Sequence, residues 1–315
     1  MLSVKFNEYY AYYSWAQLMG VLEIIQREWS SLGKVFKSGF AFFVMAGTKK
    51  SSIFSSRKVF TRGYDVLGNI AIVKFKRGAG KAEKIRFAKK ILGDYKSVKT
   101  VLEKSRKFHG RLRTLSTKYV LGEKTKEALY RENGCEFRFN VETCYFSPRL
   151  ANERLEIAKM VEKGESVLVL FAGVAPFSIV IAKTGKPSKV VSVELGKDCS
   201  KYALENVKRN KVNVEVVQGD VRRVLPKMKE KFDRIVMARP NLKDDFLDVS
   251  FPRVRKGGII YYYGFYDEKD VDEMRAMIVQ RAKEAGRKIR ILKIKEAGDI
   301  GVKKYRYRVD IRVLN

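Results

Sequence analysis

The amino-acid sequence predicts an α/β protein with a doubly wound, mostly parallel sheet, preceded by two smaller α+β modules. From about residue 145, short apolar runs alternate with helical segments, as in a parallel sheet covered by helices on both faces. An apolar run at 167–170 enters a tight turn of small residues, and the next two predicted strands end in the acids Glu194 and Asp220. A strand, a tight turn and an acid after the following strand are typical of a nucleoside-binding sheet.

Residues 1–61 are predicted to form a small separate module. Apolar residues at helical spacing predict a helix over residues 8–29, and an aromatic-rich run predicts a buried strand at 40–44. Basic and polar stretches at 49–52 and 55–58 have the composition of loops. Polar residues occur early in the chain, so we do not expect a signal peptide.

Residues 62–144 are predicted to form a second module with an α+β pattern. We expect strands at 70–75, 98–102 and 119–121, and a helix over 81–92. The basic residues of this module include Lys74, Lys76, Arg77, Lys81, Lys84, Lys104, Arg106, Lys107, Arg111 and Arg113. A run of charge is usually only a solvated face. Here the charges cover strands and helices alike, which favours a nucleic-acid-binding surface.

Residues 145–315 supply the predicted parallel sheet. Its strands are expected at 167–170, 190–193, 214–217, 234–237 and 258–263. Helices are expected at 150–161, 198–210 and 267–285. Alternating basic residues at 288–295 and 306–313 predict a terminal hairpin. Together these elements make an open sheet with helices on both faces.

The charge of the chain points to a polyanionic partner. Lys and Arg number 66 against 35 Asp and Glu, which gives a formal net charge of +31. Solubility needs far less charge than this. The alternative is a charge-rich surface like that of a thermophilic protein. Such a surface has more acidic as well as more basic residues, whereas here the number of acidic residues is not raised to match. Nucleic acid is therefore the favoured partner.

The three cysteines, Cys135, Cys144 and Cys199, predict neither a disulfide framework nor a zinc site. Their number is odd and no CxxC spacing occurs. His109 is the only histidine, which argues against a histidine-rich metal centre. No apolar run is long enough to span a membrane. We therefore expect a soluble protein of a reducing compartment, with no membrane partner.

The turn after the first strand of the sheet favours a ligand without phosphate. It reads Phe171-Ala172-Gly173-Val174-Ala175-Pro176, with one glycine where a pyrophosphate would need several open backbone amides. S-adenosylmethionine fits, because it offers adenine, ribose and an amino-acid tail but no phosphate. The alternative is an ordinary strand–helix turn.

The acids at the next two strand ends fit the same cofactor. Glu194 would accept hydrogen bonds from the ribose hydroxyls, and Asp220 would accept from the adenine amino group, with Val221 lining the base. The alternative for each acid is the N-cap of a helix, and Asp220 can serve as both.

Several short motifs in the chain together resemble one known family. They are residues 65–71 (DVLGNIA), 132–135 (ENGC), 145–154 (YFSPRLANER), 171–174 (FAGV) with 176–178 (PFS), and 233–237 (DRIVM). In this order they resemble the archaeal and eukaryotic tRNA (guanine-37, N1)-methyltransferase family. The resemblance covers about residues 60–315. It reaches the first module only by size and position.

The resemblance implies an organisation and an activity. Residues 145–315 would be a Rossmann-like, class I S-adenosylmethionine-dependent methyltransferase domain, 62–144 a basic RNA-binding module and 1–61 a small tRNA-contacting module. The family transfers a methyl group to N1 of guanosine 37, next to the anticodon. The implied partner is tRNA, held at the anticodon stem-loop and the elbow, by a cytoplasmic monomer.

The resemblance also assigns roles at the site. Glu153 would remove the N1 proton, Arg113 would hold O6, and Tyr145 would support the flipped-out base. Pro240 would line the base, and Arg154 would reach the cofactor or the substrate. The remaining cofactor-binding residues would be Phe171, Gly173, Pro176, Glu194, Leu195, Asp220 and Val221.

Each role has a plainer alternative. Glu153 could be an exposed helix acid that pairs with Arg149 or Arg154, and Arg113 one more phosphate contact. Tyr145 could simply pack. Phe177 or the tyrosines at 261–263 could receive the base, although strand tyrosines are more often core residues.

The chain departs from the family pattern at three places. Val169 stands where the family usually has an acid, Ala175 replaces the second turn glycine, and Ala238-Arg239-Pro240 replaces Asn-Leu-Pro. The asparagine of that last motif helps to hold the guanine in the family. A more open site would suit 4-demethylwyosine, a tricyclic base that some archaeal members methylate at C7. Neutral change is the alternative.

Two other functions remain open at this point. The related aminocarboxypropyl transferase of wyosine synthesis has the same fold and cofactor but transfers a different carbon. A non-catalytic RNA-binding protein is the second, supported by Val169 and Ala175.

Overall fold

The computed structural model describes residues 3–6, 9–12, 61–105, 110–238, 244–301 and 303–315 of the chain. The chain divides into two compact units, Met1–Lys58 and Val59–Asn315. In the first unit, β1 (Ser3–Phe6) pairs antiparallel with β2 (Tyr9–Tyr12). The helix predicted over residues 8–29 is therefore wrong at its start, where three tyrosines favour a strand. The rest of that helix, and the predicted strand at 40–44, lie outside the described residues.

The second unit begins with a four-stranded sheet in the order β3-β4-β5-β6. Its strands are β3 (Thr61–Leu67), β4 (Ile70–Phe75), β5 (Thr100–Lys104) and β6 (Thr117–Gly122). The helix α3 (Lys81–Asp94) packs Ala88 and Ile91 on this sheet. The predicted helix and the predicted strands at 70–75, 98–102 and 119–121 are confirmed. The strand β3 was not predicted.

A two-stranded ribbon follows, made of β7 (Glu127–Glu132) and β8 (Cys135–Asn140). Its turn is Asn133-Gly134, both with positive φ, as a tight hairpin requires. Asn69 accepts from the Leu129 amide at 2.7 Å and donates to the Glu127 carbonyl at 3.2 Å. The ribbon was not predicted, although an Asn-Gly pair followed by alternating apolar residues is a hairpin signal.

The other edge of the ribbon is also bonded by side chains. Asn206 accepts from the Arg138 amide at 2.8 Å and donates to its carbonyl at 3.0 Å. Asn210, one helical turn later, does the same to Glu136 at 2.8 and 2.7 Å. Amide side chains therefore replace a neighbouring strand at both edges of the ribbon.

A seven-stranded sheet forms the rest of the unit, in the order β11-β10-β9-β12-β13-β15-β14. Its strands are β9 (Ser166–Leu170), β10 (Lys189–Glu194), β11 (Glu215–Gln218), β12 (Phe232–Met237), β13 (Val254–Asp267), β14 (Ile289–Gly301) and β15 (Lys304–Val313). The strands β9 to β13 run parallel, and the terminal hairpin of β14 and β15 is antiparallel. The strand order reverses at β9, so the predicted doubly wound fold is confirmed.

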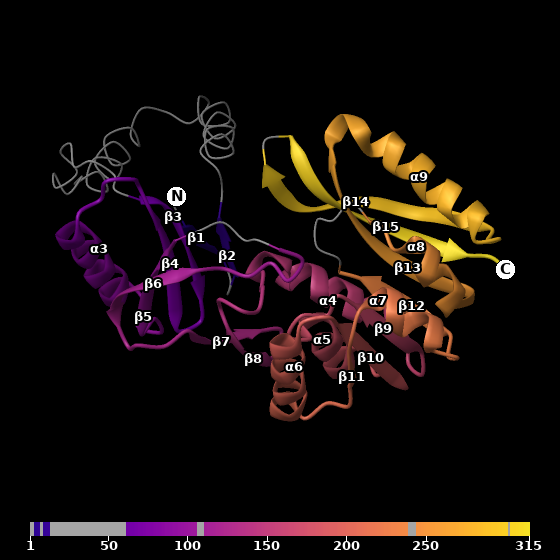
Figure 1. The fold of residues 1–315 in the computed structure, drawn as a ribbon, viewed down its shortest axis with the longest axis horizontal. Coiled ribbons are helices and arrows are strands. Elements are labelled where there is room, and N and C mark those ends of the chain that lie inside the picture. Colours follow the sequence, from indigo (N-terminus) through magenta and orange to yellow (C-terminus); the bar gives the residue numbers. More distant parts are fainter. Residues whose placement is uncertain (1–2, 7–8, 13–60, 106–109, 239–243, 302) are drawn as a thin grey trace, which may run out of the picture. The chain divides into compact units, whose positions relative to one another are not determined.

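Helices cover both faces of this sheet. The helices α4 (Ala151–Met160), α5 (Pro176–Thr184) and α6 (Lys197–Asn210) lie on the face that carries Val167 and Val169. The helices α7 (Val221–Val224), α8 (Leu247–Ser250) and α9 (Val271–Glu284) lie on the face that carries Leu168 and Leu170. Figure 1 shows α9 lying along the terminal hairpin. Successive strand residues alternate between the two layers, which is why β9 is apolar throughout.

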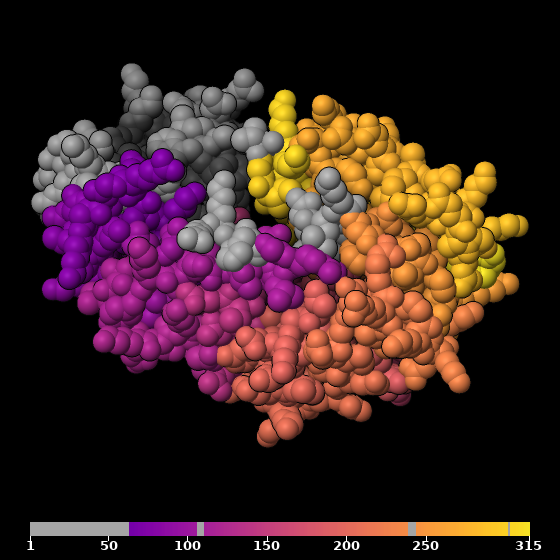
Figure 2. Space-filling view, viewed as in Figure 1, coloured from indigo at the N-terminus to yellow at the C-terminus, as the bar shows by residue number. Residues whose placement is uncertain are grey.

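Four short 3₁₀ helices complete the described secondary structure: Pro148–Leu150, Leu225–Lys227, Phe251–Arg253 and Glu268–Asp270. No helix among the described residues is long and apolar enough to cross a membrane. In the space-filling view, the indigo-to-magenta residues of β3 to β8 and the orange-to-yellow residues of β12 to β15 each form a continuous patch of surface (Figure 2).

Cys144 and Cys199 form a disulfide, whereas the odd number and the spacing of the cysteines predicted no disulfide framework. Cys144 follows β8, and Cys199 lies in the first turn of α6, 55 residues along the chain. Local spacing does not reveal this pair because only the tertiary fold brings the two positions together. Cys135 is buried as a free thiol.

Breaking this disulfide should lower the free energy of unfolding by about 4 kcal/mol, because the bond closes a long loop and so restricts the unfolded chain. In thermal unfolding, Cys144→Ser should melt below the wild type. A reductant should lower the Tm of the wild type and leave that of the variant unchanged. Equal shifts in both proteins would show that the reductant acts elsewhere.

Candidate active site

A cavity opens at the carboxyl ends of the central parallel strands, where doubly wound sheets bind their ligands. The segment before β6, the turn after β9, the ends of β10 and β11, and the strands β13 and β15 all contribute to it. The lining residues are Arg111, Leu112, Arg113, Tyr145, Leu150, Phe171, Gly173, Phe177, Glu194, Leu195, Cys199, Asp220, Val221, Ala238, Tyr263, Phe265 and Arg306.

The turn between β9 and α5 holds an unusual backbone. Phe171, Gly173 and Ala175 have φ angles of 58°, 58° and 64°, in the left-handed region. A residue with a Cβ adopts this region at a cost of about 1–2 kcal/mol. Ala175 therefore keeps the conformation that a glycine would adopt freely. Pro176 is the first residue of α5, where its missing N–H costs nothing, and it does not line the cavity.

Glu194 closes one wall of the cavity at the end of β10. One carboxylate oxygen accepts from the Gly173 amide at 2.8 Å and the other from the Gly196 amide at 2.7 Å. Burial raises the pKa of this carboxyl, and the amides of Gly196, Gly173 and Leu195 offset part of that effect. Each oxygen has a second lone pair, so the carboxylate can also accept from hydroxyl groups in the cavity.

Asp220 lies at the end of β11 and is the N-cap of α7. It accepts from the Arg222 amide at 2.9 Å, and Arg111 pairs with its other oxygen at 2.8 Å. Burial by itself raises the pKa of the Asp220 carboxyl, but the Arg222 amide and Arg111 together lower it below its usual value. Asp220 thus caps α7 and also lines the cavity, the combination that the sequence left open.

The other half of the cavity is cationic and aromatic. The Arg113 guanidinium lies 4.4 Å from the centre of the Tyr145 ring, and Arg306 lies near the same tyrosine. The Arg306 guanidinium lies 5.3 Å from the centre of the Phe265 ring. Planar guanidinium groups beside aromatic rings suit a planar, acceptor-rich ligand such as a nucleobase.

Glu153 lies behind this half, in the first turn of α4, and is buried. Its Oε1 accepts from Tyr263 Oη at 2.9 Å and from Arg308 Nη1 at 2.6 Å, and its Oε2 lies 3.2 Å from Lys295 Nζ. It does not itself line the cavity, whereas Tyr263 does. Tyr263 therefore connects the cavity to the Glu153 carboxylate.

The local pairing considered for Glu153 is wrong. Arg149 lies 3.6 Å from Asp65, and Arg154 forms a buried ion pair with Glu132. Arg154 also donates to the Ser147 carbonyl at 3.0 Å, and it does not line the cavity. The buried Arg154 side chain thus links the end of β7 to the segment before α4.

The sequence of this domain matches a known family. The model of the TRM5/TYW2 methyltransferase domain matches residues 128–292, which include the turn after β9, Glu153, Glu194 and Asp220. The chain belongs to this family. It is 36% identical over 264 residues to the tRNA (guanine(37)-N(1))-methyltransferase Trm5b of Pyrococcus abyssi, covering 82% of this chain and 76% of the relative.

Two further members of the TRM5/TYW2 family extend the comparison. The tRNA (guanine(37)-N(1))/4-demethylwyosine(37)-methyltransferase Taw22 of Nanoarchaeum equitans is 31% identical, covering 80% of this chain and 99% of the relative. The crystal structure of Trm5b from Pyrococcus abyssi superimposes with a TM-score of 0.72 at 35% identity, covering 81% of this chain and 76% of that one. The Rossmann-like methyltransferase fold is therefore established.

The structure brings most of the predicted site residues of this TRM5/TYW2 domain to one cavity. They are Arg113, Tyr145, Phe171, Gly173, Glu194, Leu195, Asp220 and Val221. Glu153, Arg154 and Pro176 lie outside the lining, and Pro240 lies outside the described residues. Sequence reasoning did not assign a site role to Arg306 or Phe265, and it considered Tyr263 only as a place for the base. The alternation in 306–313 was the only available signal.

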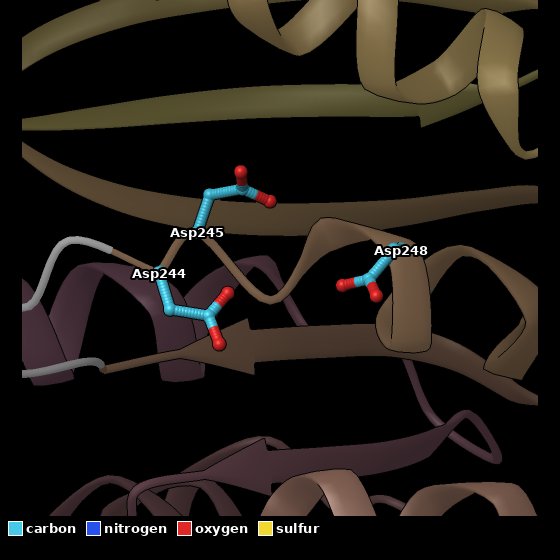
Figure 3. Close-up of side chains that lie close together, drawn as sticks. All are labelled: Asp244, Asp245 and Asp248. Atoms are coloured by element: carbon cyan, nitrogen blue, oxygen red, sulfur yellow. The ribbon is translucent and has the colours of Figure 1, made fainter.

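An acidic cluster lies near the loop before α8. Figure 3 shows Asp244 and Asp248 directed toward one another and Asp245 directed to the other side. Arg222 bridges Asp244 and Asp248 at 2.6 and 2.9 Å, and Arg281 pairs with Asp245 at 2.9 Å. Arginines thus compensate all three carboxylates, and we assign no metal site to them.

Proposed function

We propose that this protein is an S-adenosylmethionine-dependent tRNA methyltransferase that forms N1-methylguanosine at position 37. One observation carries the proposal: a single cavity joins an acid-lined nucleoside half to an arginine-lined half backed by Glu153. A relative that is named for this activity matches 82% of the chain. In this proposal, residues 1–61 and 62–144 bind tRNA and residues 145–315 carry out the chemistry.

The nucleoside half fits S-adenosylmethionine. Glu194, Asp220 and Val221 line the same cavity, where Glu194 would accept from the ribose hydroxyls and Asp220 from the adenine amino group. The turn of residues 171–175 offers the Gly173 amide to Glu194 and leaves no cradle of amides for a pyrophosphate. When bound, the cofactor supplies a methyl group on a sulfonium, which is already a good leaving group.

The arginine half fits the needs of guanine N1. That nitrogen carries a proton, so a base must remove it, and negative charge then moves to O6. Arg113 faces the cavity and would stabilise the charge at O6. Glu153 would take the proton through Tyr263, which passes its own hydroxyl proton to Glu153 as it accepts the one from N1. Tyr145 would support the flipped-out base.

The charge of the chain fits a tRNA partner. The excess of 31 positive charges supplies the phosphate contacts, and binding should therefore weaken steeply as salt rises. The anticodon stem-loop, where position 37 lies, would face the cavity, and the elbow would contact the N-terminal module. We expect the protein to act as a cytoplasmic monomer.

Ala238 supports 4-demethylwyosine as a second substrate. Ala238 lines the cavity where the family motif has asparagine, so the base half is less crowded there. A relative named for both guanosine and 4-demethylwyosine matches over 99% of its own length. We therefore include C7 methylation of 4-demethylwyosine in the proposed function. Mass spectrometry of tRNA carrying that base, before and after treatment, tests this part alone.

The by-product separates the main proposal from its rivals. Incubation with S-adenosylmethionine and a tRNA that carries guanosine 37 should give N1-methylguanosine and S-adenosylhomocysteine in equal amounts. Methylthioadenosine as the by-product would instead identify an aminocarboxypropyl transferase. Absence of S-adenosylmethionine binding in calorimetry would leave a non-catalytic RNA-binding protein.

A further inference from the structure

Arg306 lies on the face of the terminal hairpin that is directed toward the cavity. In the register of β13 and β15, Arg306 faces Phe265 and Arg308 faces Tyr263. Alternate residues of a strand share a face, so Arg306 and Arg308 point the same way. Arg308 is fully buried under α4, where it pairs with Glu153, Glu156 and Asp310. Arg306, one step nearer the cavity, lines the cavity itself.

The surroundings of Arg306 differ from those of Arg308. Arg306 is half-buried, lies near Tyr145 and packs on Phe265. None of the ion pairs among the described residues includes Arg306. Burial lowers the pKa of its guanidinium, and the nearby Arg113 lowers it further.

Two guanidinium groups therefore lie near Tyr145 in one cavity, close enough to repel each other. For Arg306, a half-buried charge that none of the ion pairs among the described residues includes, a ligand that supplies acceptors would be stabilising. Phe265 packs against the Arg306 guanidinium, which limits the side-chain freedom that binding would remove. The arrangement suits a neutral planar ligand with two adjacent acceptors, because the parallel N–H groups of arginine match such a pair.

We propose that Arg306 binds the O6 and N7 edge of the flipped-out base at position 37. Arginine bonding to both O6 and N7 of guanine is the commonest base-specific contact in protein–DNA complexes. In this chain the contact offsets the loss of the asparagine that the family carries at Ala238. The inference rests on the proposed function, and it names the residue that selects the base.

The same contact is open to the second proposed substrate. The third ring of 4-demethylwyosine is built across N1 and the exocyclic nitrogen, on the edge of the purine opposite N7. The O6 and N7 acceptors are therefore present in both bases. An arginine on this edge holds the base in either substrate, whereas a residue that reads the N1 edge meets two different shapes.

The test compares two tRNAs and two variants. One tRNA carries guanosine at position 37, and the other carries 7-deazaguanosine, which lacks only the N7 acceptor. Single-turnover methylation is measured with saturating enzyme and S-adenosylmethionine. Arg306→Ala should slow methylation of guanosine 37 on the order of 10- to 100-fold, the size of one two-bond base contact. Wild type should be slower on 7-deazaguanosine, whereas Arg306→Ala should treat the two tRNAs alike.

Arg312→Ala is the matched control. Arg312 lies on the same strand, is exposed and faces Ile259 in the register of β13 and β15. Its replacement removes the same charge about 20 Å along the strand from Arg306. It should leave the single-turnover rates on both tRNAs at wild-type values.

Three results would contradict the proposal. If the change from guanosine to 7-deazaguanosine slows methylation by the same factor in Arg306→Ala and in wild type, Arg306 does not contact N7. A rise in the Kd of S-adenosylmethionine that matches the loss of rate would place the guanidinium on the amino-acid tail of the cofactor. If wild type methylates neither tRNA, the proposed function itself fails, and this inference fails with it.

Discussion

Replacing Glu153 by glutamine should slow formation of N1-methylguanosine by about 10²- to 10⁴-fold, the usual contribution of a general base. Glutamine keeps the shape and still accepts from Tyr263, but its amide cannot take up a proton. Single-turnover kinetics measure the rate, and calorimetry should show an unchanged Kd for S-adenosylmethionine. A variant with the wild-type rate would remove Glu153 as the base.

Glu156→Gln controls for the loss of charge. Glu156 lies one turn after Glu153 on α4 and contacts the same two cations, Arg308 at 2.9 Å and Lys295. Either variant leaves these cations with one acid fewer, so both should melt below the wild type. Only Glu153 reaches the cavity through Tyr263, so Glu156→Gln should stay near the wild-type rate. Equal loss of activity in both variants would indicate a structural effect.

Replacing Glu194 by alanine should raise the Kd of S-adenosylmethionine by about 100-fold or more. The change removes the acceptor for ribose hydroxyls, where each charge-assisted hydrogen bond contributes about 1.5–3 kcal/mol. It also releases the amides of Gly173 and Gly196, which loosens the turn. Calorimetry measures the Kd. Glu205→Ala, which removes an exposed acid from α6, should leave it unchanged.

The pH dependence of cofactor binding by the wild type follows from the same residue. Burial raises the pKa of Glu194, so its ionised, accepting form is lost at a higher pH than for an exposed glutamate. Affinity should therefore be complete above the raised pKa and fall as the pH drops through it. In Glu194→Ala the Kd should vary less over this range. A steep fall in the variant would point to another group.

The sequence was sufficient for the sheet and for the acids at its strand ends. A buried strand such as β9 shows in the sequence as an unbroken apolar run. The acids Glu194 and Asp220 come at or just after the ends of mainly apolar runs, so their place at the strand ends could be predicted from the sequence. The partners of Glu153 could not be predicted, because Arg308 and Lys295 lie more than 140 residues away in sequence and meet it only through the hairpin register. The same reason hides Arg306 and the Cys144–Cys199 bond.

The motif of residues 65–71 contains Asn69, which bonds one edge of the β7–β8 ribbon. Asn69 lies in the turn between β3 and β4 and bonds β7, while Asn206 and Asn210 belong to α6 and bond β8. Three primary amides thus bond the ribbon along its two edges, one from the β3–β4 turn and two from α6. If either partner moved away, backbone groups of the ribbon would lose these hydrogen bonds. If tRNA docks on the basic residues of 62–144, as proposed, these hydrogen bonds would link that surface to the strands and helices that carry the cavity.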